Sequence, residues 1–277
     1  MKILKLFFKN KKSIGGIIIL TFFVVIAIFA PFIAPYSPKD MAFLPLQLPN
    51  SNNILGTTAM GEDIFSQVVW GTRQSLIVSL LTGSIATLIS VIIGFSAGYF
   101  GGIVDEILMT ITNVFLVIPG FPLIIILSAF LPIKGMWIII FVISITGWAW
   151  GARTLRSQVL SLKSRDFIKA AIVIGENSFH IIFVEIFPNL LSLVAANFLG
   201  ATVYALLSES GLQFLGLGDV RAVSWGTILY WAQNNQALHF GLWTWVLVPG
   251  ICIALLGMAL SLINFAIDEI TNPRLRR

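Results

Sequence analysis

The chain has 277 residues, of which 57% are hydrophobic and only 10% charged, and its formal net charge is +5. Soluble domains carry about 25% charged residues, so most of this chain is expected to lie in a lipid bilayer. The basic balance does not indicate a nucleic-acid partner, because membrane proteins collect Lys and Arg on their cytoplasmic side. A single cysteine, Cys252, leaves no pair for a disulfide, and the two histidines lack the spacing of a zinc motif.

Long uncharged stretches predict the membrane-spanning helices, because a span needs about 20 mainly apolar residues. Six helices are expected, near residues 14–34, 75–98, 108–131, 135–152, 187–208 and 242–266. We interpret the first as an uncleaved helix, since its apolar run is longer than that of a signal peptide. The "VIPGFP" stretch at 117–122 is expected to kink the third helix. The fold class is therefore an all-α polytopic membrane protein.

The distribution of basic residues predicts the orientation of these helices. If the N-terminus is cytoplasmic, thirteen Lys and Arg residues lie inside and four lie outside, namely Lys39, Arg73, Lys134 and Arg221. The positive-inside rule then predicts that both termini are cytoplasmic. The chain divides into an N-terminal transmembrane helix with an extracellular segment (1–73) and a five-helix core (74–277). Residues 153–186 form the longest internal loop, and the prolines of segment 35–73 argue against a regular helix there.

Several kinds of chemistry find no support in the sequence. The chain contains no Gly-Lys pair and hence no phosphate-binding loop for ATP. The "SESG" stretch at 208–211 resembles an intramembrane serine protease only superficially, because the glycine before the dyad is missing. The six expected helices contain no ionisable residue, with Glu209 and Asp268 expected at helix ends. This pattern argues against a proton-coupled transporter.

The internal loop contains two short predicted helices. The first runs from Asp166 to about Ile174, and its acidic first residue suits the helix dipole. Gly175 follows where a helix that ends in the left-handed conformation favours glycine. Asn177 or Ser178 can cap the second helix, and Pro188 falls near the point where that helix is expected to enter the membrane.

Two interpretations of this loop compete on physical grounds. It could rest on lipid headgroups as an amphipathic helix, or it could dock on another protein. The small residues Ala170 and Ala171 favour docking, because they let a groove wall approach closely.

The stretch "KAAIVIGENSFHIIFVEIFPN" (169–189) resembles the cytoplasmic EAA loop of ATP-binding-cassette importer permeases. Four residues match the spacing of that loop: Ala170, Ala171, Gly175 and Pro188. Lys169 stands where the loop has its first Glu, and Glu185 stands where a His is often found. These departures affect the polar contacts of the loop rather than its backbone.

Three further motifs extend the resemblance in the same order along the chain. They are "LGTTAMGEDIFSQVVWGTRQSL" (55–76), "SESGLQFLGLG" (208–218) followed by "SWG" (224–226), and "TNPRLR" (271–276). Together they resemble the shorter permease subunit of dipeptide, oligopeptide and nickel importers.

The resemblance implies the type I importer permease architecture of six transmembrane helices, in the cell membrane of a prokaryote. It implies a second, different permease as partner, two cytoplasmic ATPase subunits that carry ATP and magnesium, and an extracellular solute-binding protein. This chain itself would bind no cofactor and catalyse no reaction. The substrate is expected to be a peptide, with oligosaccharide and nickel as alternatives. The implied ATPase-coupling residues are Asp166, Lys169, Ala170, Ala171, Gly175, Glu176, Phe179 and Pro188.

Polar residues within the expected spans are candidates for the translocation pathway, since such groups usually face the interior of a bundle. They are Asn113, Asn197, Tyr204, Ser208 and Gln213. Hydrogen bonding between helices is the alternative explanation for each of them. For the whole chain, a stand-alone secondary transporter or channel is the second hypothesis, and a structural membrane protein is the third.

Overall fold

Helices make up nearly all of the regular structure in the computed structural model, which describes residue 7 and residues 10–271. Ten α-helices are α2 (Lys11–Ile33), α3 (Ile64–Phe100), α4 (Gly102–Val117), α5 (Gly120–Phe130), α6 (Met136–Gly147), α7 (Ala149–Lys163), α8 (Asp166–Val173), α10 (Phe187–Phe214), α11 (Trp225–Asn234) and α12 (Trp243–Thr271). A single turn, α9 (Ser178–His180), and a π-helix, η1 (Ile181–Ile186), connect α8 to α10.

The described residues include four helices that are long and apolar enough to span a membrane, namely α2, α3, the continuous run from Ser178 to Phe214, and α12. Two bent pairs pass the same criteria together, α4 with α5 and α6 with α7. Each bent pair corresponds to one expected span, so the number of spans is six if each pair crosses once. The predicted kink is confirmed, because the chain bends by 88° between α4 and α5.

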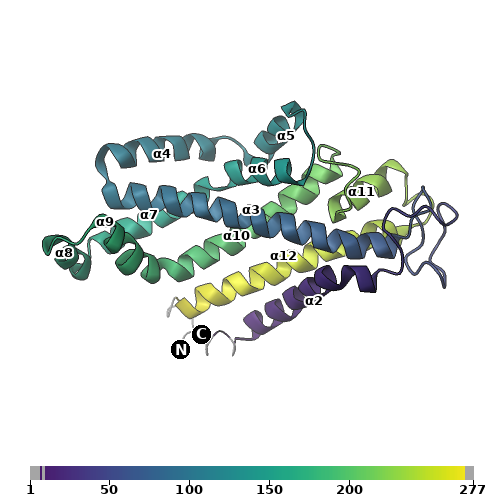
Figure 1. The fold of residues 1–277 in the computed structure, drawn as a ribbon, viewed down its shortest axis with the longest axis horizontal. Coiled ribbons are helices and arrows are strands. Elements are labelled where there is room, and N and C mark those ends of the chain that lie inside the picture. The colour runs from purple at the N-terminus through teal and green to yellow at the C-terminus, as the bar shows by residue number, and fades with distance from the viewer. Residues whose placement is uncertain (1–6, 8–9, 272–277) are drawn as a thin grey trace.

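The central helix α3 lies against α7 and α10 along much of its length (Figure 1). Glycines allow these close approaches. A Cβ atom on Gly94 would lie 2.7 Å from the carbonyl oxygen of Ala152 on α7. On Gly83 it would lie 3.0 Å from the Cα atom of Thr202 on α10. Small residues at such contacts are typical of membrane helices, which associate through packing rather than through the hydrophobic effect.

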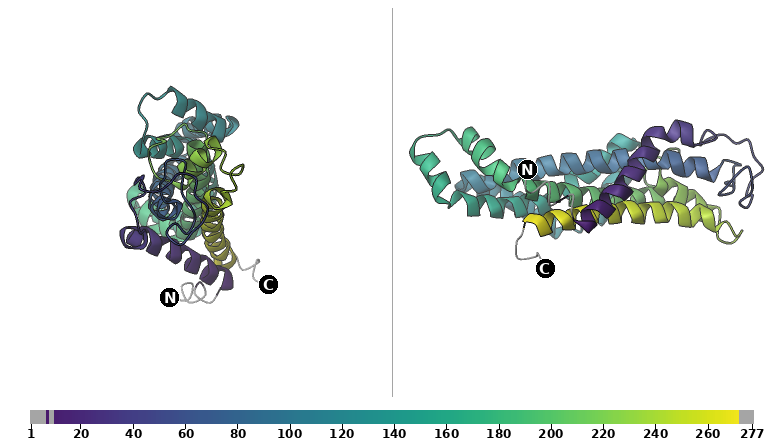
Figure 2. Two further views of the ribbon diagram at one scale, coloured as in Figure 1. Left: turned by 90° about the vertical axis from the view of Figure 1, so that its right-hand side faces the viewer. Right: turned by 90° about the horizontal axis from the view of Figure 1, so that it is seen from below.

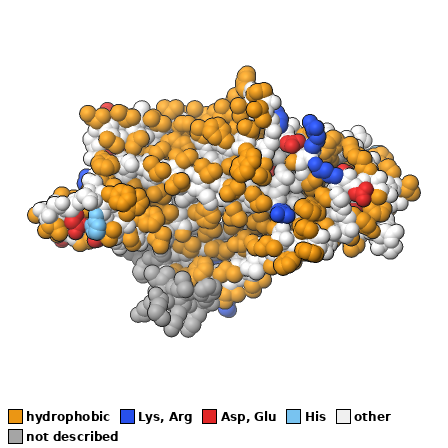
Figure 3. Space-filling view, viewed as in Figure 1, with side chains coloured by type: hydrophobic (Ala, Val, Ile, Leu, Met, Phe, Trp, Pro, Cys, Tyr) orange, Lys and Arg blue, Asp and Glu red, His pale blue; other side chains and the backbone are white. Residues whose placement is uncertain are grey.

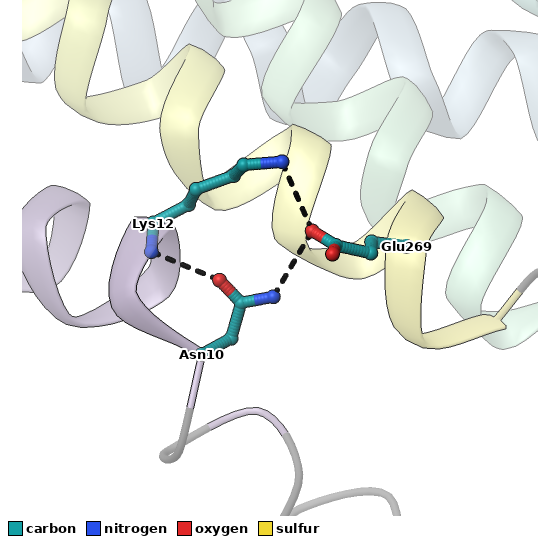
Figure 4. Close-up of polar contacts among 3 residues, drawn as sticks. All are labelled: Asn10, Lys12 and Glu269. Atoms are coloured by element: carbon teal, nitrogen blue, oxygen red, sulfur yellow. Dashed lines mark hydrogen bonds and ion pairs between the residues drawn. The ribbon is translucent and has the colours of Figure 1, made fainter. Parts of the chain in front are cut away.

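The first and last long helices meet at their ends. Glu269, near the end of α12, accepts a hydrogen bond from the Asn10 side chain (3.2 Å) and pairs with the ammonium group of Lys12 (3.1 Å), as Figure 4 shows. Asn10 also caps α2, because its side-chain oxygen accepts from the backbone N–H of Lys12. The start of α2 and the end of α12 therefore lie on the same side of the molecule, as an even number of spans requires.

Two helices extend beyond the expected hydrocarbon spans. The start of α3 was expected near residue 75, but the helix begins at Ile64, where the Asp63 side chain accepts from the backbone N–H of Ser66 at 2.8 Å. Likewise α7 continues past residue 152 to Lys163, so the first part of the expected loop 153–186 is helical. In both cases a charged residue set the predicted boundary of the span, but the helix continues past that residue.

The segment between α2 and α3 forms no helix, as the prolines predict. A buried hydrogen bond from Asn53 Nδ2 to Oδ1 of Asp63, the N-cap of α3, holds it at the start of that helix (3.0 Å). Within the segment, the Thr57 hydroxyl accepts from the Gln47 N–H and donates to the Leu44 carbonyl. The segment lies at one end of the long axis of the molecule, and α8 and α9 lie at the other end (Figures 1 and 2). Hydrophobic side chains cover much of the surface between these ends (Figure 3), as a lipid-facing surface requires.

Candidate functional site

The predicted break in the internal loop is present at Gly175. Its φ is +83°, and α8 ends just before it with two closing hydrogen bonds, from Gly175 N–H to the Ile172 carbonyl and from Glu176 N–H to the Ala171 carbonyl, both 3.1 Å. This is the left-handed helix ending that favours glycine. Asn177 then caps the next turn, since its side chain accepts from the backbone N–H of His180 at 2.7 Å. We call residues 164–180 the corner.

The corner packs on the rest of the chain through one face only. Ile168 and Ala171 are buried in a cluster with Leu155, Val159 and Tyr99. Ala171 therefore contacts its own chain, and of the predicted alanine pair only Ala170 is exposed. The other predicted coupling residues are also exposed or half-buried, namely Asp166, Lys169, Gly175, Glu176, Phe179 and Pro188.

The exposed surface of the corner includes three large apolar side chains. Val173 is 85% exposed, Ile174 is 74% exposed and Phe179 is 71% exposed. An exposed group of this kind marks a contact with a protein or with lipid. A hydrogen bond next to the corner ties this part of the chain to α3. The ammonium group of Lys163, which directly precedes the corner, donates to the Tyr99 carbonyl at the end of α3.

The second helix of the loop differs from the expected one. A π-helix runs from Ile181 to Ile186 and passes without interruption into α10, and Pro188 lies in the first turn of α10. Proline has no N–H to donate to the residue four positions earlier, and its ring crowds that carbonyl. The helix widens here, as the bond from the Phe187 N–H to the Ile182 carbonyl shows. Pro188 was the signal in the sequence that could have predicted this distortion.

A cavity of about 580 Å³ lies between α4, α6, α7, α10 and α12. Two of the five predicted pathway residues, Asn197 and Tyr204, line it. Two glycines make room for the Asn197 and Tyr204 side chains at the cavity wall. A Cβ on Gly151 would lie 2.3 Å from the Asn197 amide oxygen, and a Cβ on Gly120 would lie 2.7 Å from the Tyr204 hydroxyl. The volume is within the range of about 300–1,000 Å³ that is usual for small-molecule sites.

The polar groups of this cavity include two that have no hydrogen-bond partner among the described residues. Asn197 Nδ2 and Asn264 Oδ1 are both buried and unbonded, one a donor and the other an acceptor. Buried polar atoms are normally satisfied, so both suit a polar ligand or water. Asn264 and Asp268 of α12 line the cavity but were missed from the sequence. Their i, i+4 spacing, which places both on one helix face, was the available signal.

The other three predicted pathway residues lie elsewhere. Asn113 is on the exposed side of α4, where it accepts a hydrogen bond from Arg153 at 2.5 Å. Ser208 and Gln213 are buried in the C-terminal half of α10, and a Cβ on Gly218 would lie 2.3 Å from the Gln213 side chain. For Asn113 the bond to Arg153 supports the alternative explanation, hydrogen bonding between helices.

The position predicted for Glu209 was wrong. It was expected at a helix end, but α10 continues to Phe214, and Glu209 lies inside the helix with no exposed surface. Its carboxylate accepts from the hydroxyls of Ser75 (3.5 Å) and Ser210 (3.4 Å). The expected spans stopped at Ser208 because Glu209 is charged, whereas the helix ends only before Gly216, whose φ is +72°.

The long apolar helices, packed through glycines, define an integral membrane protein with a cavity between its helices and an exposed corner at one end. A solved structure with this fold is described as "Inward facing conformations of the MetNI methionine ABC transporter: CY5 SeMet soak crystal form". The two structures have a TM-score of 0.58, and the match covers 76% of this chain and 97% of the other. The sequences are 18% identical, so this likeness shows the fold alone.

Family and sequence comparisons are more specific. Residues 90–277 match the family "Binding-protein-dependent transport system inner membrane component", and residues 2–50 match the "N-terminal TM domain of oligopeptide transport permease C". The chain therefore belongs to the inner membrane components of binding-protein-dependent transport systems, and it is a multi-pass permease subunit of an ABC importer. As a member of a permease family it is a transport component rather than an enzyme on its own.

The curated relatives match over nearly their whole length. The dipeptide transport system permease protein DppC of Bacillus subtilis is 33% identical, over 97% of this chain and 84% of the relative. The oligopeptide transport system permease protein OppC of the same organism is 31% identical, over 98% and 88%. OppC of Mycobacterium tuberculosis H37Rv is also 31% identical, over 92% and 88%.

Proposed function

We propose that this chain forms one half of a peptide pathway through the cell membrane of a prokaryote, together with a second, different permease subunit. Two ATPase subunits, which hold ATP and magnesium, drive the movement, and a solute-binding protein delivers the substrate from outside. The observation that carries the proposal is the match over the whole chain to permeases named for dipeptide and oligopeptide transport. Nickel and oligosaccharide are the competing substrates. Neither is named for these relatives.

The corner is the part that we assign to contact with an ATPase. It projects at the end of the molecule opposite segment 34–63 (Figure 1), and it exposes the apolar side chains of Val173, Ile174 and Phe179. Its inward face packs on α3 and α7, so a displacement of the corner is transmitted to α7, which borders the cavity. Movement of packed rigid bodies is the usual form of such a switch. The corner and both termini are then cytoplasmic, in agreement with the distribution of Lys and Arg.

The cavity is the part that we assign to the substrate. Peptides carry backbone amide groups, and the unbonded Asn197 Nδ2 and Asn264 Oδ1 atoms provide one donor and one acceptor for them. Asp268 adds a carboxylate to the same lining. No ion coupling is needed in this scheme, because the free energy for transport comes from ATP bound to the partner subunits.

Reconstitution tests the proposed function. The assembled transporter, purified through a tag on this chain, is placed in liposomes with the solute-binding protein. We expect ATP-dependent uptake of labelled dipeptides or oligopeptides and no competition by nickel or by an oligosaccharide. Uptake at an undiminished rate in liposomes that lack the ATPase subunits would instead identify a secondary transporter or channel.

A further inference from the structure

A second pocket lies at the outer end of the molecule, remote from the cavity between the helices. Its volume is about 250 Å³, and it lies between segment 34–63, the segment 220–223, α11 and the start of α12. Trp231, Trp245 and Ile228 form apolar walls. Its size is just below the range of about 300–1,000 Å³ that is usual for complete small-molecule sites. The pocket can therefore hold one residue of a larger ligand rather than the whole of it.

One wall of this pocket carries a buried donor without an acceptor. Trp245 is 1% exposed, and its indole N–H has no hydrogen-bond partner within the described part of the chain. The indole groups of Trp148, Trp225 and Trp231 all donate to backbone carbonyls, at 2.9, 3.2 and 2.9 Å. A buried N–H without an acceptor is destabilising. Trp245 therefore adds an unsatisfied hydrogen-bond donor to the residues that line the pocket.

Two cations, Lys39 and Arg221, and one carboxylate, Glu62, line the pocket, so the excess of positive charge favours an anionic acceptor. Lys39 and Arg221 line it and are exposed, and neither forms an ion pair with a carboxylate of the described residues. The Glu62 carboxylate already accepts from the Thr58 hydroxyl (3.0 Å) and the Gln67 amide (2.8 Å). The nearby Asp219 accepts from the backbone N–H of Arg221 at 3.0 Å.

The cationic character continues beside the pocket. An adjoining hollow of about 350 Å³ is lined by Lys39 and also by Arg73 of α3. Figure 3 shows Lys and Arg side chains gathered toward this end of the molecule. Cationic side chains above an apolar wall recognise an anion that carries an apolar body.

We infer that this outer pocket binds a free carboxylate attached to an apolar side chain, with the carboxylate on Lys39, Arg221 and the Trp245 indole. This inference rests on the proposed function, under which the ligand is the C-terminal residue of an incoming peptide. The pocket then holds that end of the peptide at the outer surface before the peptide enters the pathway. It would select peptides with a free C-terminus and an apolar last residue.

Isothermal titration calorimetry on the assembled transporter, purified through this chain and free of the solute-binding protein, tests the inference with alanyl-leucine and its C-terminal amide. We expect the free acid to bind at least tenfold more tightly than the amide. Arg221→Gln and Trp245→Phe should each remove most of that preference. Lys134→Gln and Trp243→Phe are the matched controls, since neither residue lines the pocket, and they should keep it.

Equal binding of acid and amide by the unaltered transporter, or a preference unchanged in both pocket variants, would overturn the inference. Uptake assays separate this failure from failure of the proposed function. If calorimetry shows no preference for the free acid but the reconstituted transporter imports both peptides, the pocket assignment fails and the peptide importer stands. If it imports neither, the proposed function fails, and the binding comparison still decides whether the pocket recognises a carboxylate.

Discussion

Arg156 donates two hydrogen bonds to Asp105, each 2.5 Å long, from Nε to Oδ1 and from Nη2 to Oδ2. The pair ties α7 to the first turn of α4, and both side chains are less than one third exposed. Two parallel bonds of this kind fix orientation as well as distance, which a lysine cannot reproduce. The cavity lies between the same two helices, so this pair contributes to the shape of its wall.

We therefore expect Arg156→Lys to lower the stability of the permease by about 1 kcal/mol, because one of the two hydrogen bonds is lost. Thermal unfolding of the purified transporter in detergent measures the change. The exposed Lys12 offers a comparison, since Lys12→Gln removes a single contact to Glu269 and should have a smaller effect. A larger loss for Lys12→Gln would contradict the role given to Arg156.

Close helix contact predicts the effect of side chains added to α3. Gly83→Val should prevent stable accumulation in the membrane, because its Cβ would lie 2.2 Å from the Thr202 hydroxyl and 3.0 Å from the Thr202 backbone. The matched control is Gly257→Val on α12, where no atom lies within 4 Å of the added Cβ. Membrane content by immunoblot compares the two, and equal amounts would contradict the packing described for α3 and α10.

The buried carboxyl group of α10 gives a third prediction. Glu209→Gln should be tolerated, because the amide has nearly the same shape and can still bond with the hydroxyls of Ser75 and Ser210. Glu209→Lys should greatly reduce the amount of folded protein, since it buries an unpaired cation. Membrane content and thermal unfolding of both variants test this. Normal stability of Glu209→Lys would show that the site is open to water.

The turn at Gly175 links structure to the proposed coupling. With φ at +83°, a valine is strained by backbone conformation alone, because no atom lies within 4 Å of an added Cβ. We expect Gly175→Val to retain ATP hydrolysis but to reduce the number of peptides imported per ATP. Gly175→Asn should be much milder, since asparagine adopts this conformation more readily. Equal coupling ratios for both variants would contradict the assignment of the corner.

Local sequence signals predicted much of the fold. The apolar stretches predicted the spans, the two prolines of segment 117–122 predicted the kink that is seen as an 88° bend, and Gly175 predicted the turn of the corner. Each of these features acts on the backbone close to it in the sequence, so its effect can be predicted without knowledge of the tertiary packing. The ends of α3 and α10 were predicted wrongly, because charge was taken as a boundary whereas both helices continue past a charged residue.

The candidate cavity was only partly predictable. Asn197 and Tyr204 were expected in it, but Asn264 and Asp268 reach it from the last helix, and their position depends on how α12 packs on α10. Gln213 has the same polar character, yet it is buried against the Gly218 and Gly226 backbone. Polarity within a span therefore indicates that a residue faces the protein, and the packing of the helices decides whether it faces a cavity or another helix.

Thiol modification of the cavity wall tests the central claim, that this cavity is the route of the substrate. In a Cys252→Ser background, Gly200→Cys places a thiol in the cavity lining, and Gly257→Cys places one on α12 outside it. Both positions have room for the side chain, because no atom lies within 4 Å of either Cβ. We expect a bulky maleimide to abolish ATP-driven peptide uptake by the Gly200→Cys transporter and to leave the Gly257→Cys transporter active. Full uptake by fully labelled Gly200→Cys protein would contradict the account.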